Sequence, residues 1–184
     1  MKETTFNSVF TVKFYKRKLF QGAFEEYLGD YSLLVQSLSP MNNLDQVFKA
    51  GQGAGRSGSF FFFSADKKFI IKTMTKSEKS LFLSMAEEYT NYFVGHQDSL
   101  IAKIFGVFKV KIANMGKVYL MLSENVIPFQ DEENIDFIFD LKGSLVDRKV
   151  KGNIKRDTIL KDINFLIACK PNPDLVKLEE DDRE

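Results

Sequence analysis

The sequence predicts an α+β fold, an antiparallel sheet with helices packed against it. Three observations lead to this prediction. Apolar stretches of strand length form two hairpins, over residues 59–73 and 104–122, and stretches with helical spacing precede each hairpin. Hydrophobic residues make up 44% of the 184 residues, which is enough to fill the core of one domain. The order of helix, hairpin, helix, hairpin and strand is typical of helices packed on one antiparallel sheet.

The N-terminal part is predicted to be helical. Apolar side chains recur at roughly helical spacing from residue 10 to residue 28, which predicts one helix over 10–28. A second helical or mixed stretch is expected over residues 31–38. Pro40 and the pair Asn42-Asn43 are expected to break this pattern.

A glycine-rich loop precedes the first hairpin. Residues 51–58 contain four glycines, and residues 59–63 form the predicted first strand. Residues 65–68 are the predicted turn, and residues 69–73 are the predicted return strand, which carries Lys72.

The helix that follows has a capping signal at its start. Thr75 and Glu78 have the spacing of a capping box, and apolar residues from Leu81 to Phe93 share one face. The second hairpin turns at residues 114–116.

The last third of the chain is predicted to contain one more strand of the sheet. This strand covers residues 135–141, and the polar residues 149–157 are predicted to be a loop. Residues 159–167 are apolar in part, and Pro171 and Pro173 would end any helix there.

Composition excludes several classes of function. The chain has 26 basic and 25 acidic residues, a balance that argues against a nucleic-acid binder. Cys169 is the one cysteine and His96 the one histidine, so no intrachain disulfide and no Cys/His metal cluster can form. No metal site is predicted. No signal peptide or membrane span is visible, so we expect a cytoplasmic protein.

Two segments are strongly charged. A basic stretch contains Lys13, Lys16, Arg17 and Lys18. It either binds anionic lipid headgroups, where each basic residue contributes about 1 kcal/mol of binding free energy, or forms a solvated helix face. The end of the chain, from Asp174, is acidic and is expected to be a solvated tail.

The glycine loop and Lys72 together suggest phosphate binding. A glycine-rich turn lets backbone N–H groups approach phosphate oxygens closely. A lysine on the following strand can then meet the same phosphates, as in kinase nucleotide lobes. The pattern alone also fits a simple solvated lysine. The loop matches neither a Walker loop nor the glycine spacing of protein kinases.

Longer blocks of sequence make the functional assignment more specific, because they resemble segments of phosphatidylinositol phosphate kinases and occur in the same order. The blocks are Gly55-Arg56-Ser57-Gly58-Ser59-Phe60-Phe61 with Phe69-Ile70-Ile71-Lys72-Thr73, then Ser99-Leu100-Ile101-Ala102-Lys103-Ile104-Phe105-Gly106, then Asp140-Leu141-Lys142-Gly143-Ser144 with Arg148, and then Leu160-Lys161-Asp162-Ile163-Asn164-Phe165.

The resemblance implies the N-terminal lobe of a lipid kinase with the SAICAR synthase-like fold. Residues 1–49 would be an N-terminal helical segment, residues 50–167 the nucleotide-binding lobe, and residues 168–184 an acidic tail. The implied reaction is phosphorylation of a phosphoinositide headgroup by ATP with Mg²⁺, on an anionic membrane surface to which the protein binds peripherally. A homodimer or a parent kinase is an implied partner. A non-catalytic relative that binds nucleotide or lipid is the alternative.

The resemblance also implies roles for individual residues. ATP would meet Gly55, Ser57, Gly58, Ser59, Lys72, Asn125 and Lys142. The phosphoinositide would meet Lys142 and Arg148. In the segment expected to meet adenine, Ser123-Glu124-Asn125 replaces the family's Met-Asn-Asn, which leaves the side-chain contacts to adenine open.

Several of these residues have a second interpretation. Glu78 either orients Lys72 through an ion pair or only caps its helix. Asp140 would orient Lys142, although a Lys-Gly pair after a strand also fits a plain turn. Arg148 either faces the headgroup or only supports its loop.

The family's catalytic residues lie downstream of the Lys-Asp-Leu-Asp-Phe block, so this chain alone is expected to be inactive. The residues from Asp30 to Val35 spell the family's catalytic Asp-Tyr-Ser-Leu-Leu, but upstream of the glycine loop. We interpret this match as chance and expect Tyr31, Leu33 and Leu34 to face the core.

Overall fold

The computed structural model of the chain divides into two compact units, Met1–Phe129 and Gln130–Glu184. Each unit is described by itself. The described residues are 3–6, 10–29, 32–49, 60–113, 116–127, 135–155 and 158–170.

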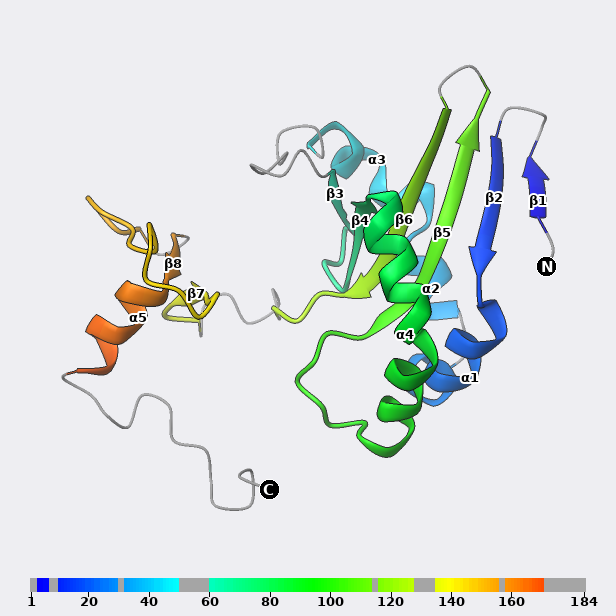
Figure 1. Ribbon diagram of the computed structural model, residues 1–184. Coiled ribbons are helices and arrows are strands. Elements are labelled where there is room, and N and C mark those ends of the chain that lie inside the picture. Colours follow the sequence, from blue (N-terminus) through cyan, green and yellow to red (C-terminus); the bar gives the residue numbers. More distant parts are fainter. Residues whose placement is uncertain are drawn as a thin grey trace. The chain divides into compact units, whose positions relative to one another are not determined.

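The first unit is built on a six-stranded sheet in the order β1-β2-β5-β6-β4-β3, in which all neighbouring strands are antiparallel (Figure 1). The strands are β1 (Glu3–Phe6), β2 (Phe10–Tyr15), β3 (Phe61–Phe63), β4 (Phe69–Met74), β5 (Ile104–Ile112) and β6 (Gly116–Glu124). The prediction of an α+β fold with an antiparallel sheet is therefore confirmed.

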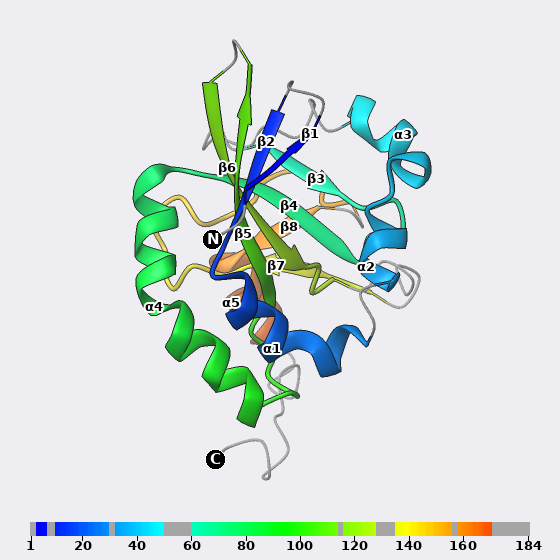
Figure 2. The same ribbon diagram turned by 90° about the vertical axis from the view of Figure 1, so that its right-hand side faces the viewer.

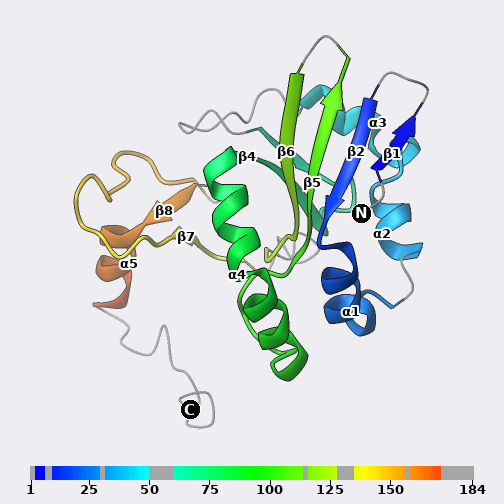
Figure 3. The same ribbon diagram turned by 45° about the vertical axis from the view of Figure 1, so that its right-hand side comes forward.

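Helices lie on both sides of this sheet. They are α1 (Arg17–Leu28), α2 (Ser32–Ser37), α3 (Pro40–Lys49) and α4 (Lys76–Gly95). Figure 2 shows α4 on one side of the strands and α2 and α3 on the other. Helix α1 continues from the end of β2, below the sheet in Figure 3.

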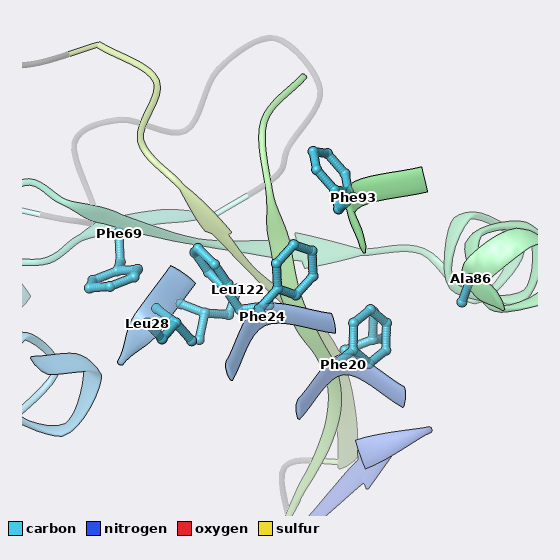
Figure 4. Close-up of a cluster of buried hydrophobic side chains, with 9 residues drawn as sticks. Phe20, Phe24, Leu28, Phe69, Ala86, Phe93 and Leu122 are labelled. Carbon is cyan, nitrogen blue, oxygen red and sulfur yellow. The ribbon is translucent and has the colours of Figure 1, made fainter. Parts of the chain in front are cut away.

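The core is formed where α1 and α4 meet the strands. Phe20, Phe24 and Leu28 project from α1 toward the strands (Figure 4) and are buried there. The rings of Phe24 and Phe105 meet edge to face at 5.3 Å between centroids, a favourable geometry for aromatic pairs. Phe69, Ala86, Phe93, Phe105, Val107 and Leu122 complete the buried cluster.

The predicted helix over residues 10–28 is wrong in its first part. Phe10, Val12 and Phe14 alternate with polar residues, and β2 pairs with β5 along its whole length. Gly106 on β5 makes room for this pairing, because a Cβ there would lie 2.6 Å from the Phe14 ring. Period-two alternation was therefore the correct signal in this stretch, and the helix begins at Arg17.

The predicted break before Pro40 is present, since α2 ends at Ser37, but Pro40 and the pair Asn42-Asn43 do not interrupt helical structure after it, because Pro40 begins α3. Proline is tolerated in the first turn of a helix, where its missing N–H has no partner to lose. The predicted helical stretch before it is confirmed as α2. Leu34 packs against the core as expected, whereas Leu33 is 37% exposed and lines a hollow near Ala65. Tyr31 lies outside the described residues.

The elements around the first hairpin are confirmed where they are described. Strands β3 and β4 pair around a turn at residues 65–68, where Lys67 adopts a left-handed conformation, φ 56°. Helix α4 begins at the predicted capping box, since Thr75 Oγ1 accepts from the amide of Glu78 at 3.1 Å. Strands β5 and β6 form the second hairpin.

The second unit is small and contains a parallel strand pair. It consists of β7 (Ile138–Asp140), β8 (Ile159–Lys161) and α5 (Asp162–Cys169). The predicted strand at residues 135–141 is therefore present, but it pairs in parallel with β8 in a separate sheet instead of joining the antiparallel one. The described residues of the predicted loop, 149–155, contain no helix or strand.

Candidate functional site

Lys72 lies on β4, between the edge strand β3 and β6 of the first unit's sheet. It is paired with Phe61 of β3 on one side and Met121 of β6 on the other. Opposite residues in antiparallel strands share a face, so the three side chains lie together. The side chain of Lys72 is half-buried, and its Nζ lies 5.4 Å from the centre of the Phe61 ring.

A cavity of about 260 Å³ lies beside Lys72, between the sheet and the N-terminal half of α4. Its described lining is mainly apolar, and Lys72 and Glu78 are the charged members. The lining residues are Lys72, Thr73, Met74, Glu78, Leu81, Phe82, Met85 and Met121. An apolar hollow with a few convergent polar groups is the usual form of a small-molecule site.

Glu78 belongs to both the helix cap and the cavity. Its carboxylate accepts from the amide of Thr75 at 2.7 Å, which confirms the capping interpretation. That bond, the hydroxyl of Thr75 and the positive charge of Lys72 hold the pKa of Glu78 below its usual value. The charge of Lys72 is the weakest of these three influences, and the role of Glu78 in orienting that lysine stays a prediction.

Asn125 follows β6 and ties it to the β3–β4 turn. Its backbone amide donates to the carbonyl of Lys68 at 2.9 Å, and its side-chain amide donates to the carbonyl of Lys67 at 2.7 Å. Its side-chain oxygen accepts from the amide of Ile127 at 3.4 Å. The described contacts of Asn125 therefore fix the backbone after β6, and its predicted contact with ATP stays a prediction.

Sequence reasoning missed a charged cluster at the end of β6. Lys103 is only 6% exposed, and its Nζ lies 3.7 Å from a carboxylate oxygen of Glu124. The hydroxyl of Tyr27 donates to the other carboxylate oxygen. The available signal was a lysine within an apolar stretch, because a buried ammonium needs a partner.

In the second unit, Lys142 and Asp140 form an exposed ion pair. Lys142 Nζ donates to both carboxylate oxygens of Asp140, at 2.9 and 2.6 Å. The hydrogen bond from Lys142, and a weaker contribution from Arg148, hold the pKa of Asp140 below its usual value. This geometry is the one expected if Asp140 orients Lys142.

The Arg148 side chain is bound by other residues of the second unit. Its Nε donates to Asp162 at 2.7 Å, and its Nη2 donates to the backbone carbonyl of Asp140. Asp162 also accepts from the amides of Lys142 and Gly143, each at 2.9 Å. These contacts favour the interpretation that Arg148 supports the loop. The guanidinium of Arg148 and the two amides keep the pKa of Asp162 well below its usual range.

Asp162 is the residue that organises this loop, although sequence reasoning gave it no role. It is the first residue of α5. Its Oδ1 accepts hydrogen bonds from the amides of the turn at Gly143, whose φ is 66°. The signal that could have identified it is an acidic residue in the first turn of a helix.

Some predicted site residues cannot be placed. Gly55, Ser57, Gly58 and Ser59 lie outside the described residues. In the part of the chain that is described, no group of three or more His, Cys, Asp or Glu side chains could hold a metal ion. None of the described helices is long and apolar enough to cross a bilayer.

Comparison with known proteins identifies the family. The family model for phosphatidylinositol-4-phosphate 5-kinase matches residues 42–184. A probable phosphatidylinositol phosphate kinase of Dictyostelium discoideum is 33% identical over 134 residues, which are 72% of this chain and 18% of that protein. Phosphatidylinositol 4-phosphate 5-kinase 7 of Arabidopsis thaliana is 32% identical over 159 residues, 85% of this chain and 20% of that protein.

A third relative gives the same result. Phosphatidylinositol 4-phosphate 5-kinase 9 of Arabidopsis thaliana is 38% identical over 112 residues, 60% of this chain and 14% of that protein. The chain thus spans a fifth or less of the length of these relatives. On this evidence the chain belongs to the phosphatidylinositol-4-phosphate 5-kinase family, within the phosphatidylinositol phosphate kinases.

Proposed function

We propose that the chain is the ATP-binding part of a phosphatidylinositol phosphate kinase. Such an enzyme transfers the γ-phosphoryl group of ATP to a hydroxyl of a phosphoinositide headgroup, and the products are ADP and a bisphosphorylated lipid. The observation that carries this proposal is the position of Lys72 on β4, half-buried beside a cavity and next to Met121. Family membership supports it.

Lys72 is suited to hold nucleotide phosphates. Strand β4 is paired on both sides, with β3 and β6, so the backbone that carries the ammonium is held in place before a ligand arrives. Because the Lys72 side chain is half-buried, the attraction of its ammonium for phosphate is stronger than it would be on an open surface. Glu78 would keep the lysine extended toward the cavity. The backbone amides of Gly55, Ser57, Gly58 and Ser59 would bind the phosphates from the loop that precedes β3.

The adenine ring would lie near the end of β6. Met121 lines the cavity and is four residues before Asn125. The backbone groups after β6, held by Asn125, would offer hydrogen bonds to the base edge. This arrangement needs no direct contact between the base and the side chain of Glu124, so it is compatible with the departure from the family pattern.

Lys142 would meet the phosphoinositide and the transferred phosphate. Its side chain is 59% exposed, and its ammonium is held by Asp140. An exposed ion pair contributes little to stability, so a phosphate can take the place of the carboxylate at small cost. The guanidinium of Arg148 is largely buried against Asp162, so its part would be to hold the loop that presents Lys142.

Mg²⁺ would accompany ATP in this reaction, but the described residues do not form a site for it. Mg²⁺ takes oxygen ligands, usually one or two carboxylates together with phosphates. The carboxylates of Asp140 and Asp162 are both occupied by cationic side chains.

The proposed place of action is the cytoplasmic face of an anionic membrane. The support is the basic stretch before and within the start of α1, where Lys16, Arg17 and Lys18 are exposed. Binding to vesicles with and without phosphatidylserine, in 0.1 and 0.5 M salt, measures this contribution. Equal binding to neutral and anionic vesicles would contradict it.

Calorimetric titration of the chain with ATP and Mg²⁺ tests the nucleotide assignment. We expect binding by the wild type and at least a tenfold loss in Lys72→Met, since the charge that meets the phosphates is removed. Lys117→Met is the matched control, because Lys117 is an exposed lysine at the far end of β6, and it should bind as the wild type does. Equal binding by both variants would refute the role of Lys72.

A further inference from the structure

The end of β6 is held by side chains from two other parts of the first unit. The hydroxyl of Tyr27, near the end of α1, donates to the carboxylate of Glu124. Lys103, which lies just before β5, approaches the same carboxylate with its ammonium at 3.7 Å. The ammonium also lies over the rings of Tyr27 and Phe93, at 4.6 and 5.7 Å from their centres. Glu124, Lys103 and Tyr27 thus form one connected cluster.

Backbone hydrogen bonds join the same segments. The amide of Glu124 donates to the carbonyl of Lys103 at 2.7 Å. The hydroxyl of Tyr89, on α4, accepts from the amide of Ile104 at 2.7 Å and donates to the carbonyl of Ala102 at 2.8 Å. The chain on both sides of Lys103 is therefore fixed to α4, and the end of β6 is fixed to Lys103.

The cluster adjoins the segment that Asn125 holds. Asn125 is bonded to the β3–β4 turn, and Glu124 is bonded on its other side to α1 and Lys103. The four residues from Glu124 to Ile127 are thus anchored from two directions. This segment is the last described part of the first unit before the chain continues into the second.

We propose that Tyr27, Lys103 and Glu124 are positioning residues that fix the backbone of residues 124–127 where the nucleotide is to bind. The inference rests on the proposed function for its consequence in binding, whereas the anchoring itself does not. It also gives α1 a part in the site, although α1 lies outside the range matched by the family model, residues 42–184.

A physical reason favours this role over simple core packing. Tyr27 is 45% exposed, so its hydroxyl is not needed to fill the core. Hydrophobic residues in place of Lys103 and Glu124 would avoid the cost of burying charge. A directional contact between charged and hydroxyl groups, in contrast, fixes one geometry of the backbone that carries them.

Hydrogen exchange of the amides of residues 124–127 in the full chain tests the anchoring. Tyr27→Phe removes only the hydroxyl, and Glu124→Gln keeps the shape of the side chain while removing its charge. We expect each variant to raise exchange in this segment about tenfold, the effect of losing one hydrogen bond to a charged group. In the double variant the two effects should be less than multiplicative, because Glu124→Gln weakens the hydrogen bond that Tyr27→Phe removes, in addition to losing the ion pair with Lys103.

Tyr92→Phe is the matched control. The hydroxyl of Tyr92, on α4, donates to Ser99 at 3.2 Å and has no contact with Glu124. Exchange at residues 124–127 should therefore equal that of the wild type. If Tyr27→Phe leaves exchange in this segment unchanged, or if the effects of the two variants multiply, the proposal is overturned.

Titration of the same variants with ATP and Mg²⁺ separates this inference from the proposed function. We expect Tyr27→Phe to weaken binding several-fold while its melting temperature stays close to that of Tyr92→Phe. Faster exchange with unchanged ATP affinity would overturn the positioning role and leave the anchoring in place. If the wild type itself binds no ATP, the proposed function fails, and the exchange experiment still decides the anchoring.

Discussion

Two cationic side chains that the sequence suggested for phosphate binding, Lys72 and Arg148, lie in opposite kinds of surroundings. Among the described residues, the Lys72 ammonium lies over an aromatic ring, and Lys72 borders a cavity that Glu78 also lines. The guanidinium of Arg148 is bound by the carboxylates of Asp140 and Asp162 and is largely buried. Lys72 therefore lies next to a cavity that a ligand can fill, whereas Arg148 stabilises the fold of the second unit.

The comparison shows that a basic residue in a family motif can serve either to bind a ligand or to stabilise the fold. A residue that binds phosphate must keep donors available for it, whereas a buried cation with carboxylate partners would leave unpaired charge behind if it turned to a ligand. The first unit therefore carries the candidate site in its sheet. In the second unit, the Arg148–Asp162 pair builds the loop on which Lys142 is presented.

The largest effect is expected from the core of the first unit. Phe24→Ala should lower the free energy of unfolding by about 3–5 kcal/mol, because it removes a buried ring and leaves a cavity. Chemical denaturation followed by circular dichroism measures the loss. If the two units are independent, amide exchange at Lys142 and Gly143 should stay as in the wild type. A parallel loss of protection there would show that the units fold together.

The reverse experiment is Asp162→Ala. Removing this carboxylate leaves Arg148 without its main partner and the amides of Lys142 and Gly143 without an acceptor. We expect their protection from exchange to be almost completely lost, with the first unit unchanged. Asp136→Ala, at an exposed position of the same unit, is the control and should have no effect. Retained protection in Asp162→Ala would contradict the role given to this residue.

Acid should act on the second unit through the same carboxylates. The pKa values of Asp140 and Asp162 are lower in the folded state than in an unfolded chain, where aspartate has a pKa of about 3.9. Their contribution to stability is therefore complete above about pH 3.9 and is lost as the pH falls below it. Protection of the Lys142 amide, corrected for intrinsic exchange, should be constant between neutral pH and about pH 5 and then decline in stronger acid. A decline already near pH 6 would point to another group.

The smallest effect concerns Glu78 and separates its two interpretations. Thr75→Ala removes the N-cap side chain of α4 and should cost about 1 kcal/mol, measured by thermal melting. Glu78→Gln keeps the capping box, since glutamine also serves at that position, but removes the charge near Lys72. Weaker ATP binding in Glu78→Gln at unchanged stability would support the orienting role. Unchanged binding would leave the cap as its function.

Local signals in the sequence predicted most of the first unit. The capping box at Thr75, the two hairpins and α2 depend on neighbouring residues, so their positions could be predicted. Strand β2 was missed because Phe10 and Phe14 fit both a helical and an alternating spacing, and only pairing with β5 decides between them. Residues that are distant in sequence decide such cases.

The candidate site was predictable to a similar degree. The motif and its position on the return strand led to Lys72. Local signals point to Asp162 and Lys103 individually but not to their partners, because the contacts of these two clusters join residues 14 and 97 positions apart. The parallel pairing of β7 and β8 also brings together distant segments, and no local pattern indicates its direction.

The most direct test of the central claim is to label the chain with an acyl-phosphate derivative of ATP, which acylates lysines that lie at the nucleotide phosphates. Peptide mass spectrometry then identifies the modified residues. We predict modification of Lys72 that an excess of ATP prevents, with exposed lysines such as Lys68 and Lys117 labelled weakly and without competition. Labelling that follows surface exposure, with Lys72 unmodified and no effect of ATP, would contradict the assignment of the nucleotide site.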